Sequence, residues 1–211
     1  EIAAAKYPDG RAIVPEVCIF FENLLLRGNR TTKINAENFN AFRSYNYPPL
    51  ATVGIHIKYE YDRIRKADPN LPMHPHYVFD TNVLILTIFP GIQENVVSNI
   101  FQSPGLKAVV LKTYGSGNAP QKPWFIRLLK EATQRGIIIV NISQCPAGMV
   151  EMGRYETGLH LLDAGVISGY DATVESVLTK LMFLLGHNLS PKEVRTEMSR
   201  SIAGEFSRPE L

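Results

Sequence analysis

The sequence is poor in cysteine, has no long apolar run and carries little net charge. Its two cysteines, Cys18 and Cys145, are too few for a disulfide framework and favour a reducing compartment, so we expect a cytoplasmic protein. No uncharged apolar run approaches the roughly 18 residues of a membrane span, and no signal-peptide pattern is present. The net charge is +2 without a basic block, so neither nucleic acid nor a membrane is an expected partner.

Motifs of several common enzyme classes are also missing. There is no Gly-x-Ser-x-Gly elbow, no phosphate-binding P-loop and no evident Ser-His-Asp set. Gly115-Ser116-Gly117 is similar to part of a dinucleotide loop, but without a third glycine it indicates a close backbone approach or an anion-binding turn at a helix N-terminus. His74 and His76 alone are too weak a pattern to predict a metal site.

What the sequence does contain is a strand–turn–helix–strand unit between residues 107 and 145. An apolar run at 108–111 is followed by a glycine-rich break, a helical pattern at 123–134 and a second apolar run at 137–140. Such units build parallel sheets, and ligands of open α/β sheets bind beyond the carboxyl ends of the strands. We therefore expect any chemistry of the second half at residues 112–120 and 141–145.

The remaining patterns extend this unit into an alternating series. We expect a hairpin turning at Glu22-Asn23 and a strand at 53–61 in the first part, and a charged, proline-containing linker at 62–76. The pattern of the second part predicts strands and helices in the order β-α-β-α-β-α-α. Its expected helices are 95–102, 123–134, 155–164, 173–185 and one that begins with a capping box at Ser190. This order predicts an α/β, three-layered domain with a parallel sheet over residues 77–211.

Spacing alone favours a structural role for residues 27–33 and for Cys145. Residues 27–33, Arg-Gly-Asn-Arg-Thr-Thr-Lys, are polar and follow a strand, so they are interpreted as a solvated turn. Cys145 follows a strand end, where a nucleophile could lie, but no base is near it in sequence, and a small buried residue is the favoured interpretation. The residues by themselves lead to an α/β protein with a polar small-ligand site.

The same stretches resemble the bacterial-type L-asparaginases, in particular the cytoplasmic type I branch. The similarity covers nearly the whole chain, and its motifs are specific and ordered. They are Phe20-Phe21 with residues 26–33, Phe42-Arg43-Ser44, residues 46–51, residues 114–120, Gln144-Cys145 with Gly148, Tyr155, Thr157-Gly158, residues 164–167, and Glu175 with residues 178–181.

The resemblance implies which part of the family fold this chain holds. Family members carry a Thr-Gly-Gly-Thr-type turn with the nucleophilic threonine and a later Gly-Thr-Asp turn, and neither is found here. The chain also begins without Met, so we expect part of a longer protein. By resemblance, residues 1–61 are the C-terminal part of the α/β catalytic N-terminal domain, 62–76 the linker, and 77–211 the smaller C-terminal domain.

The resemblance also implies roles for individual residues. Lys33 matches the catalytic lysine that supports the proton network of the threonine nucleophile during hydrolysis of L-asparagine to L-aspartate and ammonia. Asn118 matches a substrate-binding asparagine that reaches into the neighbouring subunit's site, which implies a homodimer or homotetramer. No cofactor is implied. On this interpretation the fragment alone is inactive.

Type I members also carry a second asparagine site that makes L-asparagine an effector. The matching positions are Thr32, Lys112, Ser143 and Cys145. The chain departs from the family at Lys112, where an arginine is usual. Lysine keeps the charge but loses the two-pronged geometry that suits a carboxylate.

Two other interpretations stay open. One is the asparaginase-like subunit of a tRNA-dependent amidotransferase, for which the small net charge gives little support. The other is a non-catalytic amino-acid-binding or oligomerisation fragment, favoured by the missing threonine turns. An additional N-terminal segment of ~100 residues or more with a Thr-Gly-Gly-Thr turn would favour the enzyme.

Overall fold

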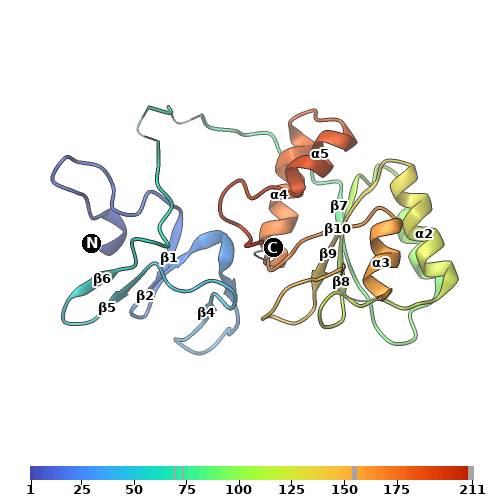
Figure 1. Ribbon diagram of the computed structural model, residues 1–211, viewed down its shortest axis with the longest axis horizontal. Coiled ribbons are helices and arrows are strands. Elements are labelled where there is room, and N and C mark those ends of the chain that lie inside the picture. Colours follow the sequence, from blue (N-terminus) through green and yellow to red (C-terminus); the bar gives the residue numbers. More distant parts are fainter. Residues whose placement is uncertain (69, 73, 154–155, 209–211) are drawn as a thin grey trace. The chain divides into compact units, whose positions relative to one another are not determined.

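The structure is a computed structural model that describes residues 1–68, 70–72, 74–153 and 156–208 (Figure 1). The chain divides into two compact units, residues 1–76 (unit 1) and 77–211 (unit 2). Among the described residues between 60 and 82, none belongs to a helix or strand. No helix in the described part of the chain is both long and apolar enough to cross a bilayer.

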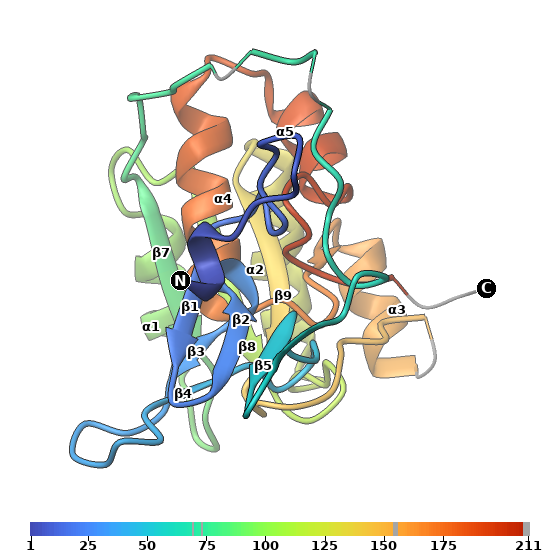
Figure 2. The same ribbon diagram turned by 90° about the vertical axis from the view of Figure 1, so that its left-hand side faces the viewer.

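Unit 1 is built on a small antiparallel sheet. Its strands are β1 (Cys18–Phe21), β2 (Leu24–Arg27), β5 (Ala51–Val53) and β6 (Ile57–Tyr59), in the order β1-β2-β5-β6. Figure 2 shows β1, β2 and β5 beside one another. The pair β3 (Thr32–Lys33) and β4 (Phe42–Arg43) forms a separate ladder, and η1 (Ile2–Ala4) and η2 (Gly28–Arg30) are short 3-10 helices.

The first predicted turn is confirmed and the predicted strand at 53–61 is wrong. β1 pairs with β2 through a two-residue turn in which Glu22 has a φ of 54°, the left-handed conformation of tight hairpins. Residues 53–61 instead turn back on themselves, because Val53 pairs with Ile57 and the N–H of Gly54 donates to the carbonyl of His56 at 3.1 Å. The alternation of apolar residues continues across this turn and hides it in the sequence.

Unit 2 contains a four-stranded sheet that is parallel throughout. Its strands are β7 (Val83–Thr87), β8 (Ala108–Thr113), β9 (Ile138–Ser143) and β10 (Ile167–Ser168), in the order β10-β9-β8-β7. The two central strands are nearly continuous apolar runs because helices bury both of their faces. The predicted parallel α/β domain is confirmed, and the short strand β10 between α3 and α4 adds one strand to the predicted order of elements.

The described helices of unit 2 complete the three layers, and Figure 1 shows α2 and α3 on one side of the sheet and α4 and α5 on the other. α1 (Glu94–Phe101), α2 (Pro123–Gln134) and α3 (Glu156–Asp163) pack on one face, over Val109, Leu111 and Ile139. α4 (Val174–Gly186) and α5 (Pro191–Met198) pack on the other face, over Val110 and Val140. Alternate residues of each strand therefore enter different cores, as the two-residue period of a strand requires.

Helix ends in unit 2 follow local sequence signals. The predicted capping box of α5 is present: the Ser190 hydroxyl accepts from the N–H of Glu193, and the Glu193 carboxylate accepts from the N–H of Ser190 at 2.8 Å. Gly136 follows the end of α2 with a φ of 94°, a conformation that glycine adopts without strain. Tyr155, the expected start of the third helix, lies outside the described residues.

Candidate active site

The segment from Arg27 to Lys33 is largely buried, so its interpretation as a solvated turn is wrong. Arg27, Arg30 and Thr31 expose 5%, 2% and 6% of their surface. The chain leaves β2, makes the single turn η2 and enters β3. Gly28 packs against the chain entering β1 so closely that a Cβ there would lie 2.9 Å from the carbonyl oxygen of Val17.

Buried arginines are tolerated here because each one is matched by a partner. The Arg27 guanidinium donates to both oxygens of Glu16, at 2.5 and 3.0 Å, in the two-pronged geometry that suits arginine. Burial lowers the pKa of Arg27, but these bonds to Glu16 outweigh it and raise the pKa overall. Arg30 donates to the carbonyl of Asn46 at 3.0 Å, and both guanidinium groups lie over the ring of Tyr47. The segment is therefore a rigid support for β3.

Lys33 lies at the end of this support and is exposed. It pairs with Phe42 across the β3–β4 ladder, and its ammonium lies 6.0 Å from the centroid of the Phe42 ring. Among the described residues, the Lys33 ammonium contacts this aromatic ring, and no carboxylate forms an ion pair with it. Thr32 precedes it on the same strand and is half-buried. Lys33 is thus a charged amine held on a strand and available to a further partner.

The other predicted site residues lie in unit 2, at the carboxyl ends of β8 and β9. Lys112 pairs with Ile142, and Thr113 pairs with Ser143. The Ser143 hydroxyl donates to the carbonyl of Gly115 at 2.6 Å and accepts from the N–H of Cys145 at 2.9 Å. Ser143 and Cys145 are thus hydrogen-bonded at the carboxyl end of β9, and Lys112 lies opposite Ile142 near the carboxyl end of the neighbouring strand, whereas Thr32 belongs to unit 1.

Gln144 ties this edge together from between two of the predicted residues. Its side-chain amide donates to the carbonyl oxygens of Ile88 and Lys112, at 2.7 and 3.0 Å, and its N–H donates to the carbonyl of Thr113 at 2.8 Å. Three strand ends are therefore joined by one residue. The sequence identifies Gln144 only as part of a motif, because its partners are far away along the chain.

Cys145 is exposed, so the expectation of a small buried residue is wrong. β9 ends at Ser143, and Cys145 lies in the following turn, outside both cores. Cys18, on β1, is partly buried. Neither cysteine forms a disulfide.

Asn118 closes a tight turn between β8 and α2. The backbone N–H and carbonyl of Asn118 exchange hydrogen bonds with those of Tyr114, at 2.8 and 2.9 Å. Gly117 has a φ of 109°, and a Cβ on it would lie 2.7 Å from Cγ1 of Val150. The glycines therefore serve a close backbone approach. α2 begins at Pro123, five residues after Asn118, so the turn is not at a helix N-terminus.

A buried polar pair beneath this turn is not predicted from the sequence. Thr113 and Asn141 are both fully buried. The Thr113 hydroxyl donates to Oδ1 of Asn141 at 2.7 Å, and Nδ2 of Asn141 donates to the carbonyl of Gly117 at 3.2 Å. A single asparagine inside the apolar run 137–142 is the available signal, because a buried amide needs partners on both sides.

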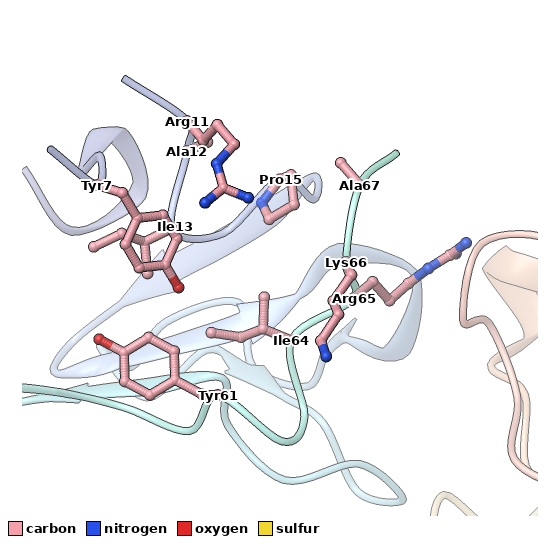
Figure 3. Close-up of a pocket in the computed structure, with 10 residues that line it drawn as sticks. All are labelled: Tyr7, Arg11, Ala12, Ile13, Pro15, Tyr61, Ile64, Arg65, Lys66 and Ala67. Carbon is pink, nitrogen blue, oxygen red and sulfur yellow. The ribbon is translucent and has the colours of Figure 1, made fainter. Parts of the chain in front are cut away.

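A cavity of about 420 Å³ lies within unit 1 (Figure 3). Tyr7 and Tyr61 face one another in it, and Arg11 and Lys66 add positive charge. Arg11 is already held by Asp9, with Nε donating to Oδ2 at 2.7 Å. Neither Thr32 nor Lys33 lines this cavity. Over the residues that the structure describes, no group of three or more His, Cys, Asp or Glu side chains could hold a metal ion.

Comparisons with known proteins agree with the resemblance in the sequence. The family model described as "Asparaginase, N-terminal" matches residues 2–65, and "Glutaminase/Asparaginase C-terminal domain" matches residues 82–198. The chain is 45% identical over 205 residues to L-asparaginase 1 of Escherichia coli K12, covering 97% of this chain and 58% of that protein.

The chain also covers at most 58% of the length of two other relatives. The human 60 kDa lysophospholipase is 42% identical over 203 residues, covering 96% of this chain and 35% of that protein. The crystal structure of L-asparaginase I from Vibrio cholerae superposes with a TM-score of 0.87 at 43% identity, covering 92% of this chain and 58% of that one. The chain thus spans less than two thirds of each of these relatives. Because the C-terminal domain model alone matches more than half of it, the chain belongs to the glutaminase/asparaginase family.

Proposed function

We propose that this chain is the C-terminal portion of an L-asparaginase that hydrolyses L-asparagine to L-aspartate and ammonia. The observation that carries the proposal is the 45% identity to an L-asparaginase over nearly the whole chain, with the Arg27–Lys33 motif intact. Residues 62–76 link the two domains in this proposal. The nucleophilic threonine belongs to the part of the family's fold that this chain does not span.

In the proposed mechanism Lys33 supports proton transfer. A threonine hydroxyl is a poor nucleophile at neutral pH and needs a neighbouring base or a lowered proton affinity. The buried segment that precedes β3 holds the Lys33 amine in place. Because no carboxylate among the described residues pairs with this amine, it is available to a threonine–aspartate pair. Water then completes the hydrolysis after ammonia leaves.

Ammonia release from L-asparagine tests the function. The assay compares the 211-residue chain with the longest polypeptide that its gene encodes, each with its mass verified. We expect no turnover by the 211-residue chain and turnover by the longer polypeptide. Turnover at a mass matching 211 residues would place the nucleophile within this chain and make Thr31, Thr32 and Cys145 the candidates.

Asn118→Ala in the active protein is expected to raise KM for L-asparagine and lower kcat. Asn118 lies in a closed turn supported by Asn141, so its side chain is well placed to orient a substrate. Steady-state kinetics measure both parameters. Unchanged kinetics would return Asn118 to the role of a structural turn residue.

Oligomerisation and location complete the proposal. An asparagine that serves a neighbouring subunit requires at least a homodimer, and a homotetramer is compatible with it. The two free cysteines support a cytoplasmic location.

The amidotransferase alternative rests on a relative, a glutamyl-tRNA(Gln) amidotransferase component of Methanobrevibacter smithii, which is 34% identical over 186 residues. A requirement for a second protein and tRNA in ammonia release would favour it.

We also propose an effector site for L-asparagine at Thr32, Lys112, Ser143 and Cys145. The hydrogen bond between Ser143 and Cys145, with Lys112 near the carboxyl end of the neighbouring strand, supports it. L-Asparagine is expected to slow alkylation of the exposed Cys145 at pH 8, measured by peptide mass spectrometry. A Lys33→Ala protein, in which the ligand is expected to be consumed ~100-fold or more slowly, is the suitable background.

Cys18 provides the internal control of this labelling experiment. Burial, and then the charge of Glu16, raises the pKa of Cys18 to about 11. Only roughly one Cys18 in a thousand is then a thiolate at pH 8, so its labelling is slow with or without ligand. Equal labelling rates of Cys145 with and without L-asparagine, or a calorimetric titration with one site per subunit, would contradict the effector site.

A further inference from the structure

Unit 2 contains a buried ion pair that the proposed mechanism does not use. Nζ of Lys180, on α4, lies 2.6 Å from Oε1 of Glu205, which belongs to the segment that follows α5. The two side chains expose 7% and 5% of their surface. Lys180 also donates to the carbonyl of Arg200. The pair therefore fastens the C-terminal segment, residues 199–208, to α4.

Glu205 is held as an anion by the segment's own backbone. Its carboxylate accepts from the N–H groups of Ile202 and Ala203, at 3.0 and 2.7 Å, and from the Ser201 hydroxyl at 3.2 Å. Burial raises the pKa of Glu205, but the hydrogen bonds from Lys180 and the backbone outweigh it and hold the pKa below its ordinary value. These hydrogen bonds join Glu205 to residues 201–203, so they also hold the backbone of the C-terminal segment in one conformation.

The next residue passes this constraint to the loop after β10. The Phe206 ring stacks on the ring of Tyr170, with centroids 5.0 Å apart and planes 23° from parallel. One position further along, the N–H of Ser207 donates to Asp171 at 2.7 Å. Tyr170 has a φ of 53°, which a bulky side chain adopts only where its surroundings impose it. The Phe206 ring supplies one part of those surroundings, and the Ser168 hydroxyl, which accepts from the N–H of Tyr170 at 3.1 Å, supplies another.

Tyr170 in turn holds the strip of chain that supports the Asn118 turn. Its carbonyl accepts from the N–H of Val150 at 3.0 Å. Val150 packs against Gly117, and the N–H of Glu151 donates to the carbonyl of Ser116 at 3.0 Å. An unbroken series of contacts thus runs from the ion pair, through Phe206, Tyr170 and residues 150–151, to the turn.

We propose that Lys180 and Glu205 are positioning residues for Asn118, acting through the C-terminal segment. A buried ion pair is weak evidence for stability, because its desolvation cost offsets most of its attraction, whereas it does fix one geometry. This geometry ends on the turn from which Asn118 projects. The catalytic consequence rests on the proposed asparaginase function; the coupling between the segment and the turn does not.

The first test uses hydrogen–deuterium exchange on the 211-residue chain. Glu205→Gln is expected to accelerate exchange of the Gly117 and Asn118 amides about tenfold, with β8 amides unchanged, since local opening sets exchange in such turns. Glu94→Gln is the matched control, because Glu94 pairs with Arg127 on the surface. If Glu205→Gln does not fold, Phe206→Leu interrupts the same series one link later. A folded variant with unaltered exchange at 117–118 would overturn the proposal.

The second test uses kinetics of the active protein. Glu205→Gln is expected to raise KM for L-asparagine several-fold with kcat changed less, and to add nothing in an Asn118→Ala background, because coupled residues are not additive. Additive effects would overturn the positioning role. If the wild-type protein releases no ammonia from L-asparagine, the proposed function fails, while the exchange test still decides the coupling.

Discussion

Lys33→Ala is expected to lower kcat for L-asparagine by ~100-fold or more in the active protein while the fold stays intact. Loss of one positioned proton-transfer group has this scale. The stability effect is expected to be small because Lys33 is exposed and its described interaction is a ring contact with Phe42. Steady-state ammonia release measures the rate, and circular dichroism verifies the fold.

Two further variants separate proton transfer from charge alone. Lys33→Arg keeps the positive charge but cannot give up a proton near neutral pH, so it is expected to be nearly as slow as Lys33→Ala. Lys58→Ala removes another exposed lysine of unit 1 and should leave the rate unchanged. Near-normal turnover of Lys33→Ala would show that the lysine assignment is wrong.

Arg27→Met is expected to destabilise unit 1 by about 3–5 kcal/mol, the cost of leaving a buried charge without its partner. Glu16 would then lose both of its bonds from the guanidinium and keep one from the N–H of Arg65, at 2.7 Å. The single tryptophan, Trp124, lies on α2 in unit 2 and does not report on this change. Hydrogen exchange of the β1 and β2 amides, such as that of Leu25, measures it instead.

The double variant Arg27→Met/Glu16→Leu provides the matched control. Because it removes both charges, most of the lost stability should return. Arg11→Met, which breaks an exposed pair with Asp9, should have no measurable effect. Equal destabilisation by the single and double variants would mean that Arg27 contributes packing rather than charge compensation.

The fold of unit 2 could be predicted because its signals are local. α2 begins at Pro123 and ends at Gln134 as its helical pattern indicates, and the capping box at Ser190 starts α5. Apolar runs of β-branched residues mark β8 and β9, and their order along the chain implies the crossovers. Each of these signals lies within a dozen residues of the structure that it specifies.

Unit 1 and the site depend on partners that are distant in sequence. Nothing near Arg27 shows that Glu16 and Tyr47 will enclose it, so a polar run looks solvated. Lys33 and Asn118 are singled out by family resemblance, and their roles remain predictions. The buried pair of Thr113 and Asn141 becomes evident only when β8 and β9 lie side by side.

The strand order of unit 2 also bears on how this domain is made. Its strands join in the order in which they occur along the chain, so each strand–helix step can dock on the preceding one as synthesis proceeds. Glu205 emerges after the helices and strands described above, and until then Lys180 has no Glu205 carboxylate to meet. A nascent chain interrupted before residue 205 would therefore lack the carboxylate partner of Lys180 and the Phe206 ring that stacks on Tyr170. Synthesis of the C-terminal segment completes both contacts.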